Sequence, residues 1–136
     1  MKLMRVLLLF LLPIYAYGLF GSKKNITVIG NLECGGSPYK AVTVELWDDD
    51  AFNFDDKLNL THTDNAGKFK LYGEAREIRN IEPYLLIKHN CDNGRHDVRC
   101  TYTDRYNIPK SYQGMIYNLN KVDLKDATVR RKTKCY

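Results

Sequence analysis

Short stretches of alternating apolar and polar residues recur along most of the chain after residue 25. Alternation with a period of two residues is typical of β-strands with one buried and one exposed face. The pattern predicts strands over residues 26–32, 42–47, 68–72, 85–88 and 115–119, and a last strand beginning at Val122 and Leu124.

Clusters of glycine, proline, asparagine and aspartate separate these stretches. They lie at residues 35–38, 63–67 and 92–94, and Ile108-Pro109 ends a further strand. Only residues 73–81 have a weakly helical pattern, and this segment is too short to form a layer. Many short strands with regular turn signals predict an all-β fold, namely an antiparallel β-sandwich of two sheets with about seven to eight strands.

The first residues have the pattern of a secretory signal peptide. Lys2 and Arg5 precede an apolar run, and small residues follow at Ala16 and Gly18. The alternative is a membrane anchor, but the run is shorter than the roughly 20 residues that span a bilayer. We therefore expect a signal peptide over residues 1–18, one domain over residues 19–136, a secreted extracellular protein, and no integral membrane segment.

Four cysteines lie in the expected mature chain, and an even number in an exported protein predicts two disulfides. Three pairings are compatible with four cysteines. We favour Cys91–Cys100, which flank a polar loop, and Cys34–Cys135, which would join the first strand to the last residues. The spacing of the cysteines does not match a zinc site.

The charge is distributed unevenly. Residues 19–87 hold 8 basic and 11 acidic residues, whereas residues 88–136 hold 11 basic and 5 acidic residues. Such asymmetry can indicate an anionic partner, although it is more often a solvated surface. If the cations of the second half cluster in the fold, they form a positive face for anionic lipid headgroups or sulfated glycans.

Two Asn-x-Thr sequons, at Asn25 and Asn59, predict N-glycosylation of an exported chain. Five aspartates, Asp48 to Asp50 with Asp55 and Asp56, form the strongest metal candidate, because Ca²⁺ prefers oxygen ligands. Their spacing is not that of an EF-hand, and we favour a solvated loop over a calcium site. We expect no cofactor.

The candidates for catalysis are few. The three histidines, His62, His89 and His96, are far apart in the sequence, and a structural role is favoured for His89. The sequence contains no nucleophile elbow or phosphate-binding loop, and paired cysteines would leave no free thiol. These features predict that the protein is not an enzyme.

Several short segments occur in a characteristic order. They are an opening strand with Cys-Gly at residues 28–35, a strand ending in aspartates at 42–50, Asp-Asp-Lys-Leu at 55–58, Thr-Asp-Asn-Ala-Gly-Lys-Phe at 63–69, and then 81–85, 89–91, Cys100 and 108–112. In this order and spacing the chain resembles the nematode transthyretin-like family of small secreted proteins. The resemblance extends from about Ile26 to Lys125.

The resemblance implies a transthyretin-like β-sandwich without an established catalytic activity. Related hydrolases of 5-hydroxyisourate end in Tyr-Arg-Gly-Ser, whereas this chain ends in Lys134-Cys135-Tyr136. We therefore expect an extracellular binding or signalling module, with an extracellular protein or cell-surface ligand as its partner. The alternatives are a 5-hydroxyisourate hydrolase-like enzyme or a bridging protein that binds anionic lipid. We expect no nucleic-acid partner.

Overall fold

The computed structural model describes residues 21–50, 54–126 and 129–136, and nearly all of this part of the chain is in strands and turns. Its elements in chain order are β1 (Ser22–Cys34), β2 (Ser37–Pro38), β3 (Thr43–Asp48), β4 (Asp56–His62), β5 (Lys68–Glu77), β6 (Pro83–His89), β7 (Cys91–Asp92), β8 (Arg95–His96), β9 (Cys100–Asn107), η1 (Lys110–Tyr112), β10 (Ile116–Asp123), η2 (Leu124–Asp126) and β11 (Arg130–Cys135). The predicted signal peptide lies outside the described residues.

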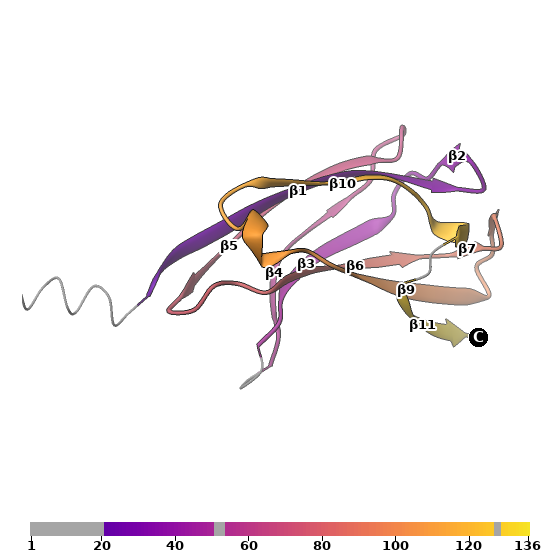
Figure 1. The fold of residues 1–136 in the computed structure, drawn as a ribbon. Coiled ribbons are helices and arrows are strands. Elements are labelled where there is room, and N and C mark those ends of the chain that lie inside the picture. The colour runs from indigo at the N-terminus through magenta and orange to yellow at the C-terminus, as the bar shows by residue number, and fades with distance from the viewer. Residues whose placement is uncertain (1–20, 51–53, 127–128) are drawn as a thin grey trace, which may run out of the picture.

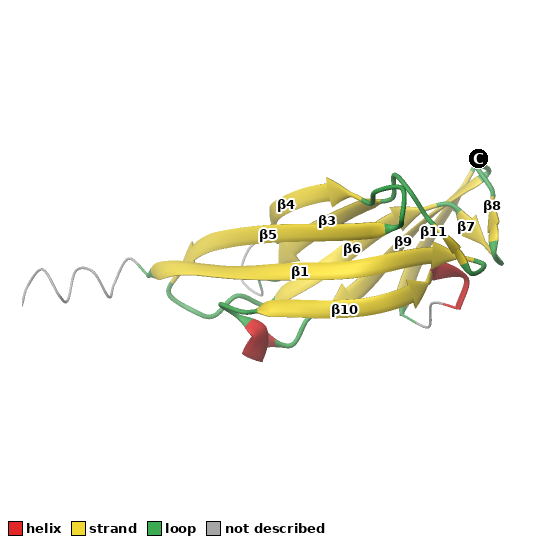
Figure 2. Ribbon diagram, turned by 90° about the horizontal axis from the view of Figure 1, so that it is seen from above, coloured by secondary structure: helices red, strands yellow, loops and turns green. Residues whose placement is uncertain are grey.

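Two sheets pack face to face (Figures 1 and 2). The four-stranded sheet places β1 between β5 and β10, with β2 paired to the end of β1, and the five-stranded sheet has the order β11-β9-β6-β3-β4. The predicted all-β sandwich is therefore confirmed. One pair differs from the antiparallel expectation, because β10 runs parallel to β1. The chain crosses between the sheets after β9, so β10 begins beside the first half of β1.

The core lies between the sheets and is built from the inward-facing positions of the alternating stretches. Ile26 and Val28 of β1 and Leu46 of β3 are completely buried. Burying such a side chain contributes roughly 1.5–3 kcal/mol. Gly30 occupies an inward position of β1, and a Cβ there would lie only 2.6 Å from the ring of Phe69. Because Gly30 has no side chain, the Phe69 ring can occupy the space beside it.

Several segments differ from the predicted ones. Residues 73–77 are the end of β5 rather than a weak helix, because they pair with residues 22–26 of β1 and tertiary pairing overrides a weak local propensity. Residues 122–123 end β10 instead of beginning a last strand, and Leu124 starts η2. The polar strands β4 and β11 were not predicted, because few of their residues are apolar. Of β9, only the end before Ile108-Pro109 was predicted.

The predicted disulfide pairing is wrong. The disulfides are Cys34–Cys91 and Cys100–Cys135. Cys91 begins β7, just after β6, and is buried in the core, where it reaches Cys34 at the end of β1. Cys100 and Cys135 lie opposite each other on the paired strands β9 and β11. Nearness in sequence was a poor guide because Cys91 faces the interior.

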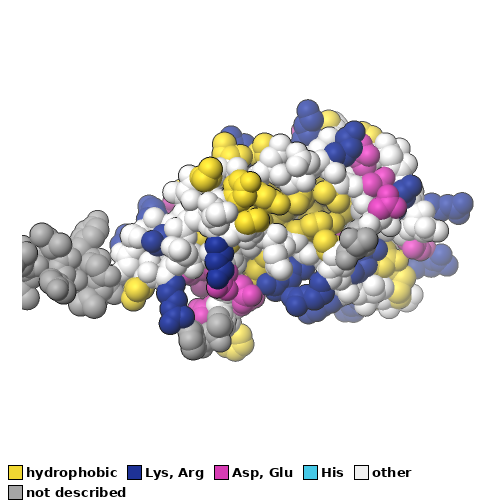
Figure 3. All heavy atoms as spheres, viewed as in Figure 1, with side chains coloured by type: hydrophobic (Ala, Val, Ile, Leu, Met, Phe, Trp, Pro, Cys, Tyr) yellow, Lys and Arg dark blue, Asp and Glu magenta, His cyan; other side chains and the backbone are white. Residues whose placement is uncertain are grey.

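The two long sides of the sandwich are closed differently. On one side the edges of β4 and β5 meet, and the Asn59 side-chain amide donates a 2.7 Å hydrogen bond to the Tyr72 carbonyl oxygen. On the other side, half-buried Tyr106, Tyr117 and Leu119 pack against the core. Figure 3 shows hydrophobic side chains gathered across the middle of that side. The first side is therefore closed by a side-chain hydrogen bond between strands, and the second by packing of half-buried side chains.

Candidate functional site

The outer face of the five-stranded sheet carries a row of aromatic and cationic side chains that crosses four strands. Trp47 of β3 stacks on Tyr84 of β6, with ring centroids 6.4 Å apart and planes inclined by 12°. The Arg105 guanidinium lies 3.7 Å from the centre of the Tyr84 ring, and Lys57 Nζ lies 5.9 Å from the centre of the Trp47 ring. Cations over aromatic faces are attracted by the ring quadrupole. Both rings are therefore held rigidly and have a cation against them.

Glu45 anchors the neighbouring part of this face. Its carboxylate accepts a hydrogen bond from Trp47 Nε1 at 3.1 Å and forms ion pairs with Lys88 at 3.2 Å and Lys57 at 3.5 Å. Burial raises the pKa of the Glu45 carboxyl, but these contacts outweigh burial and lower it overall. Glu45 is therefore a fixed negative charge that orders the lysines on either side.

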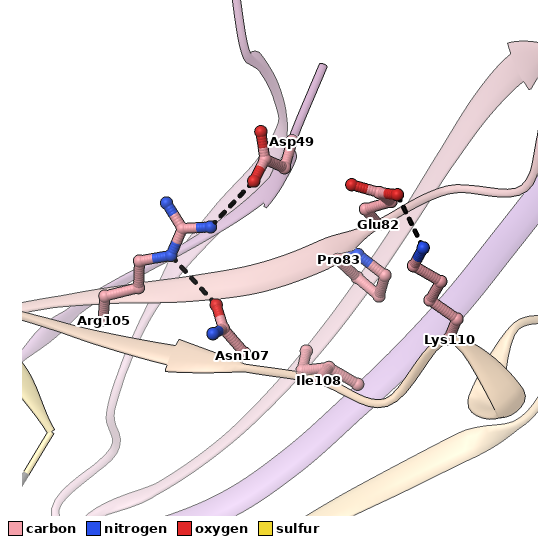
Figure 4. A pocket seen from close by; sticks show the side chains of 7 residues that line it. All are labelled: Asp49, Glu82, Pro83, Arg105, Asn107, Ile108 and Lys110. Atoms are coloured by element: carbon pink, nitrogen blue, oxygen red, sulfur yellow. Dashed lines mark hydrogen bonds and ion pairs between the residues drawn. The ribbon is translucent and has the colours of Figure 1, made fainter. Parts of the chain in front are cut away.

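A pocket of about 240 Å³ opens where β3 ends, β6 begins and β9 ends. Figure 4 shows two ion pairs across it. Arg105 contacts Asp49 at 3.1 Å, and Lys110 contacts Glu82 at 2.6 Å. Arg105 also donates to the Asn107 side-chain oxygen at 2.9 Å. Each cation of the pocket is thus paired with a carboxylate, and the pocket itself has little net charge.

The neighbouring cations on the outer face of β11 are less neutralised than those of the pocket. In the register of the sheet, Arg130 lies opposite Arg105, Lys132 opposite Thr103 and Lys134 opposite Thr101. These positions alternate with inward-facing ones, so Arg130, Lys132 and Lys134 share the outer face with Arg105 and Lys88. We call these five cations the basic face. In Figure 3, Lys and Arg side chains lie along the lower margin of the molecule, below the five-stranded sheet.

Three of the five cations have no acidic partner among the described residues. Lys88 contacts Glu45 and Arg105 contacts Asp49, but in this part of the chain no carboxylate forms an ion pair with Arg130, Lys132 or Lys134. Lys134 Nζ lies 5.4 Å from the centre of the Tyr136 ring. The basic face therefore carries an excess of positive charge that is accessible to solvent.

Beneath the basic face lies a buried His–Asp–Arg cluster that was not predicted. Asp104 of β9 is completely buried. Its carboxylate accepts hydrogen bonds from Arg131 Nε at 2.6 Å and Nη2 at 2.8 Å, and His89 Nε2 lies 2.7 Å away. His89 Nδ1 accepts from the Cys91 backbone N–H, so the proton of a neutral imidazole resides on Nε2 and points to Asp104.

The cluster fixes the electrostatics of Asp104 and the position of β11. Burial raises the pKa of the Asp104 carboxyl, but hydrogen bonds from Arg131 and His89 lower it overall. Arg131 also donates to the Leu124 carbonyl oxygen at 2.8 Å. The sequence did contain a signal for a buried charge at Asp104. Asp104 lies midway between Tyr102 and Tyr106, so in a strand its side chain points to the same inner face as these two tyrosines. Its partner on β11 could not be identified from the sequence.

The comparisons with known proteins agree with this architecture. The sequence profile of the transthyretin-like family matches residues 29–109. The chain belongs to the transthyretin-like family. Transthyretin-like protein 16 of Caenorhabditis elegans is 35% identical over 112 residues, which cover 82% of this chain and 83% of that protein. Transthyretin-like protein 2 of the same nematode is 36% identical over 98 residues, which cover 68% of this chain and 65% of that protein.

Among solved structures, a 9R-lipoxygenase from Cyanothece superposes with a TM-score of 0.47 and 18% identity, over 73% of this chain and 16% of that chain. This likeness is too distant to carry an argument.

Among the described residues of this transthyretin-like chain, no helix has the length and apolar composition of a membrane span.

The acidic residues that could have bound calcium point to different partners. Asp48 is buried and accepts from the Glu82 backbone N–H at 2.8 Å. Asp49 pairs with Arg105, and Asp55 accepts from the Tyr84 hydroxyl at 2.5 Å. Within residues 21–50, 54–126 and 129–136, no group of three or more acidic, histidine or cysteine side chains could hold a metal ion.

One further carboxyl in this region is strongly perturbed. Glu77, at the end of β5, has its pKa raised to about 8 by burial and by the nearby carboxylates of Asp48, Asp50 and Asp56. Protonation of Glu77 relieves the repulsion between like charges in this cluster. Glu77 is therefore protonated over much of the neutral range.

The histidines occupy separate environments. His62 is exposed on β4, where its Nδ1 lies 3.2 Å from the Thr43 hydroxyl. His89 is buried, and His96 is exposed on β8 with its ring 5.5 Å from that of Tyr39. Thr43 lies opposite His62 on one neighbouring strand and opposite Lys88 on the other, so these three side chains share the outer face. His89, the next residue along β6, therefore points to the opposite side of the sheet from His62. The predicted structural role of His89 agrees with its hydrogen bonds.

The two sequons lie on strands of different accessibility. Asn25 is half-buried on β1, opposite Glu74 of β5. Asn59 is exposed on β4, although its amide contacts the Tyr72 carbonyl oxygen. Glycosylation of both residues stays a prediction.

The basic residues of the second half cluster only in part. Five of them lie on the basic face, namely Lys88, Arg105, Arg130, Lys132 and Lys134. Arg131 points inward, and exposed Arg99 pairs with Asp97 at 2.7 Å. The predicted positive face therefore exists on β6, β9 and β11, but it includes only some of the basic residues of the second half of the chain.

Proposed function

We propose that this transthyretin-like chain is a secreted, non-enzymatic extracellular binding module that recognises its partner through the outer face of the five-stranded sheet. The observation that carries the proposal is the basic face, where three exposed cations have no acidic partner among the described residues and lie beside a rigid aromatic row. Unpaired surface charge of one sign steers and holds a partner of opposite charge. The partner is an extracellular or cell-surface ligand with an anionic contact region.

The arrangement of histidines supports binding over catalysis. A 5-hydroxyisourate hydrolase-like reaction would need histidines that reach substrate. His89 is completely buried and both of its ring nitrogens have partners, while His62 and His96 are on separate strands. We expect the purified protein to give no turnover of 5-hydroxyisourate above the spontaneous rate. Turnover that is lost in a folded His89→Gln variant would favour the enzyme instead.

The binding proposal is tested with charge reversal on the two sheets. Fluorescent mature protein is added to intact animal cells, and the bound fraction is compared with that of Lys88→Glu/Lys132→Glu. The control is Lys68→Glu/Lys70→Glu, which changes two exposed lysines of β5 on the other sheet and so gives the same net charge. We expect the first variant to lose most of its binding and the control to keep it. Equal losses would contradict recognition through this face.

A bridging protein that binds anionic lipid is the second candidate, and the same excess of positive charge favours it. Sedimentation with vesicles of phosphatidylcholine, with and without phosphatidylserine, distinguishes it. Electrostatic binding to phosphatidylserine decreases as salt increases, because salt screens the cations. Binding that instead requires calcium and is abolished by a chelator would indicate a different mode. Absence of binding at low salt would leave a protein or glycan partner.

A further inference from the structure

The cations of β11 form a straight row. Arg130, Lys132 and Lys134 occupy every second position of one strand and share one face. Positions two apart along a strand are separated by about 7 Å, so three cations extend over about 14 Å. This geometry presents positive charge along a line, not around a cavity.

The row is held rigid from beneath. Arg131, between Arg130 and Lys132, forms two hydrogen bonds with buried Asp104, and Cys135 is bonded to Cys100 at the end of the strand. The backbone of β11 pairs with β9 along six positions. A ligand that binds this row therefore loses little energy to ordering of the strand, although the lysine side chains still have to be ordered.

The neighbouring groups are polar. Thr101 and Thr103 lie beside Lys134 and Lys132 on the same face, and Lys88 lies on the far side of Thr103. Hydroxyls donate hydrogen bonds to anionic oxygens, and charge-assisted bonds from lysine and arginine are stronger than neutral ones. The row thus combines cations with hydroxyl donors at regular intervals.

The same neighbours discriminate between kinds of polyanion. A single-stranded nucleic acid gains much of its affinity from stacking on aromatic faces, but Trp47 and Tyr84 stack on each other and have Lys57 and Arg105 against them. A membrane contact is strengthened by apolar side chains that enter the bilayer, whereas the β9 positions that flank this row are Arg105, Thr103 and Thr101. The aromatic ring beside the row, Tyr136, has the Lys134 ammonium group 5.4 Å from its centre.

We propose that the β11 row, with Thr101, Thr103 and Lys88, binds a linear sulfated polysaccharide lying along the strand. The proposal rests on the proposed function and gives the chemical class of its ligand. Each cation in contact with an anionic surface is worth about fivefold in affinity. Removing two of them should weaken binding by about 25-fold, and raising the salt should weaken binding further.

The test measures the affinity of the oxidised mature protein for heparin by titration calorimetry. Lys132→Gln/Lys134→Gln is compared with Lys68→Gln/Lys70→Gln, and circular dichroism establishes that both variants are folded. We expect about a 25-fold loss for the first variant, less than a twofold change for the second, and no binding to desulfated heparin. Equal losses in the two variants, or no binding of the wild type to heparin at low salt, would overturn the proposal.

Cell binding separates this inference from the proposed function. If heparin fails while cell binding still depends on Lys88 and Lys132, the face is a binding site but its ligand is not a sulfated polysaccharide. If Lys88→Glu/Lys132→Glu leaves cell binding unchanged, the proposed function itself is wrong.

Discussion

Removing Arg131 should destabilise the fold much more than removing its neighbour Arg130. In Arg131→Met the stem of the side chain is kept, but the completely buried Asp104 carboxylate loses two hydrogen bonds of 2.6 and 2.8 Å. Removing one partner of a buried ion pair typically costs about 3–5 kcal/mol. The Arg131 side chain is 24% exposed, so water partly replaces it. We therefore expect a loss near the lower end of this range, about 3 kcal/mol.

The assay is urea denaturation of the oxidised mature protein at pH 7, followed by circular dichroism. The control is Arg130→Met, whose side chain is on the exposed face of the same strand and should change the free energy of unfolding by about 0.5 kcal/mol or less. Adding Asp104→Asn to Arg131→Met removes the unpaired charge, so the double variant should lose less than the sum of the single variants. A loss in Arg131→Met within about 1 kcal/mol of that in Arg130→Met would refute the reasoning.

Acid should reveal the same interaction. The pKa of Asp104 is lowered in the folded state, so the unfolded chain takes up its proton first as the pH falls. The stability contributed by this carboxylate is complete above the unfolded pKa of about 4 and is lost as the pH falls through the lower folded value. Arg131→Met should therefore lose less stability than the wild type between pH 5 and pH 2.

Three further predictions concern other parts of the fold. Because the pKa of Glu77 is raised to about 8, wild-type stability should decrease as the pH rises from 5 to 9, and Glu77→Gln should remove this decrease in urea titrations at both pH values. Gly30→Ala should lower the free energy of unfolding by about 1–3 kcal/mol, since its Cβ would lie 2.6 Å from the Phe69 ring; an unchanged denaturation midpoint would show that the ring can move away. Cys100→Ser/Cys135→Ser should lower stability by about 2–4 kcal/mol while non-reducing peptide mapping still finds the Cys34–Cys91 disulfide; free thiols at both remaining cysteines of the oxidised variant would contradict the observed connectivity.

The sequence by itself determined the fold class and much of the core. Inward-facing Ile26 and Val28 could be identified because apolar residues alternate with polar ones, and local alternation depends only on neighbouring residues. The turns at residues 63–67 and 92–94 were predicted for the same reason, because asparagine and glycine adopt positive φ without help from distant contacts. The motifs of the family were likewise local and in order.

Tertiary structure alone decided the features on which the candidate site depends. The strand β11 contains no apolar alternation, and it is placed by Arg131 reaching Asp104 and by Cys135 reaching Cys100. Both contacts join positions far apart in the sequence, so composition predicted positive charge but not which cations face outward. The cysteine pairing failed for the same reason: the direction of Cys91, toward the core, is set by packing between the two sheets and not by its distance along the chain.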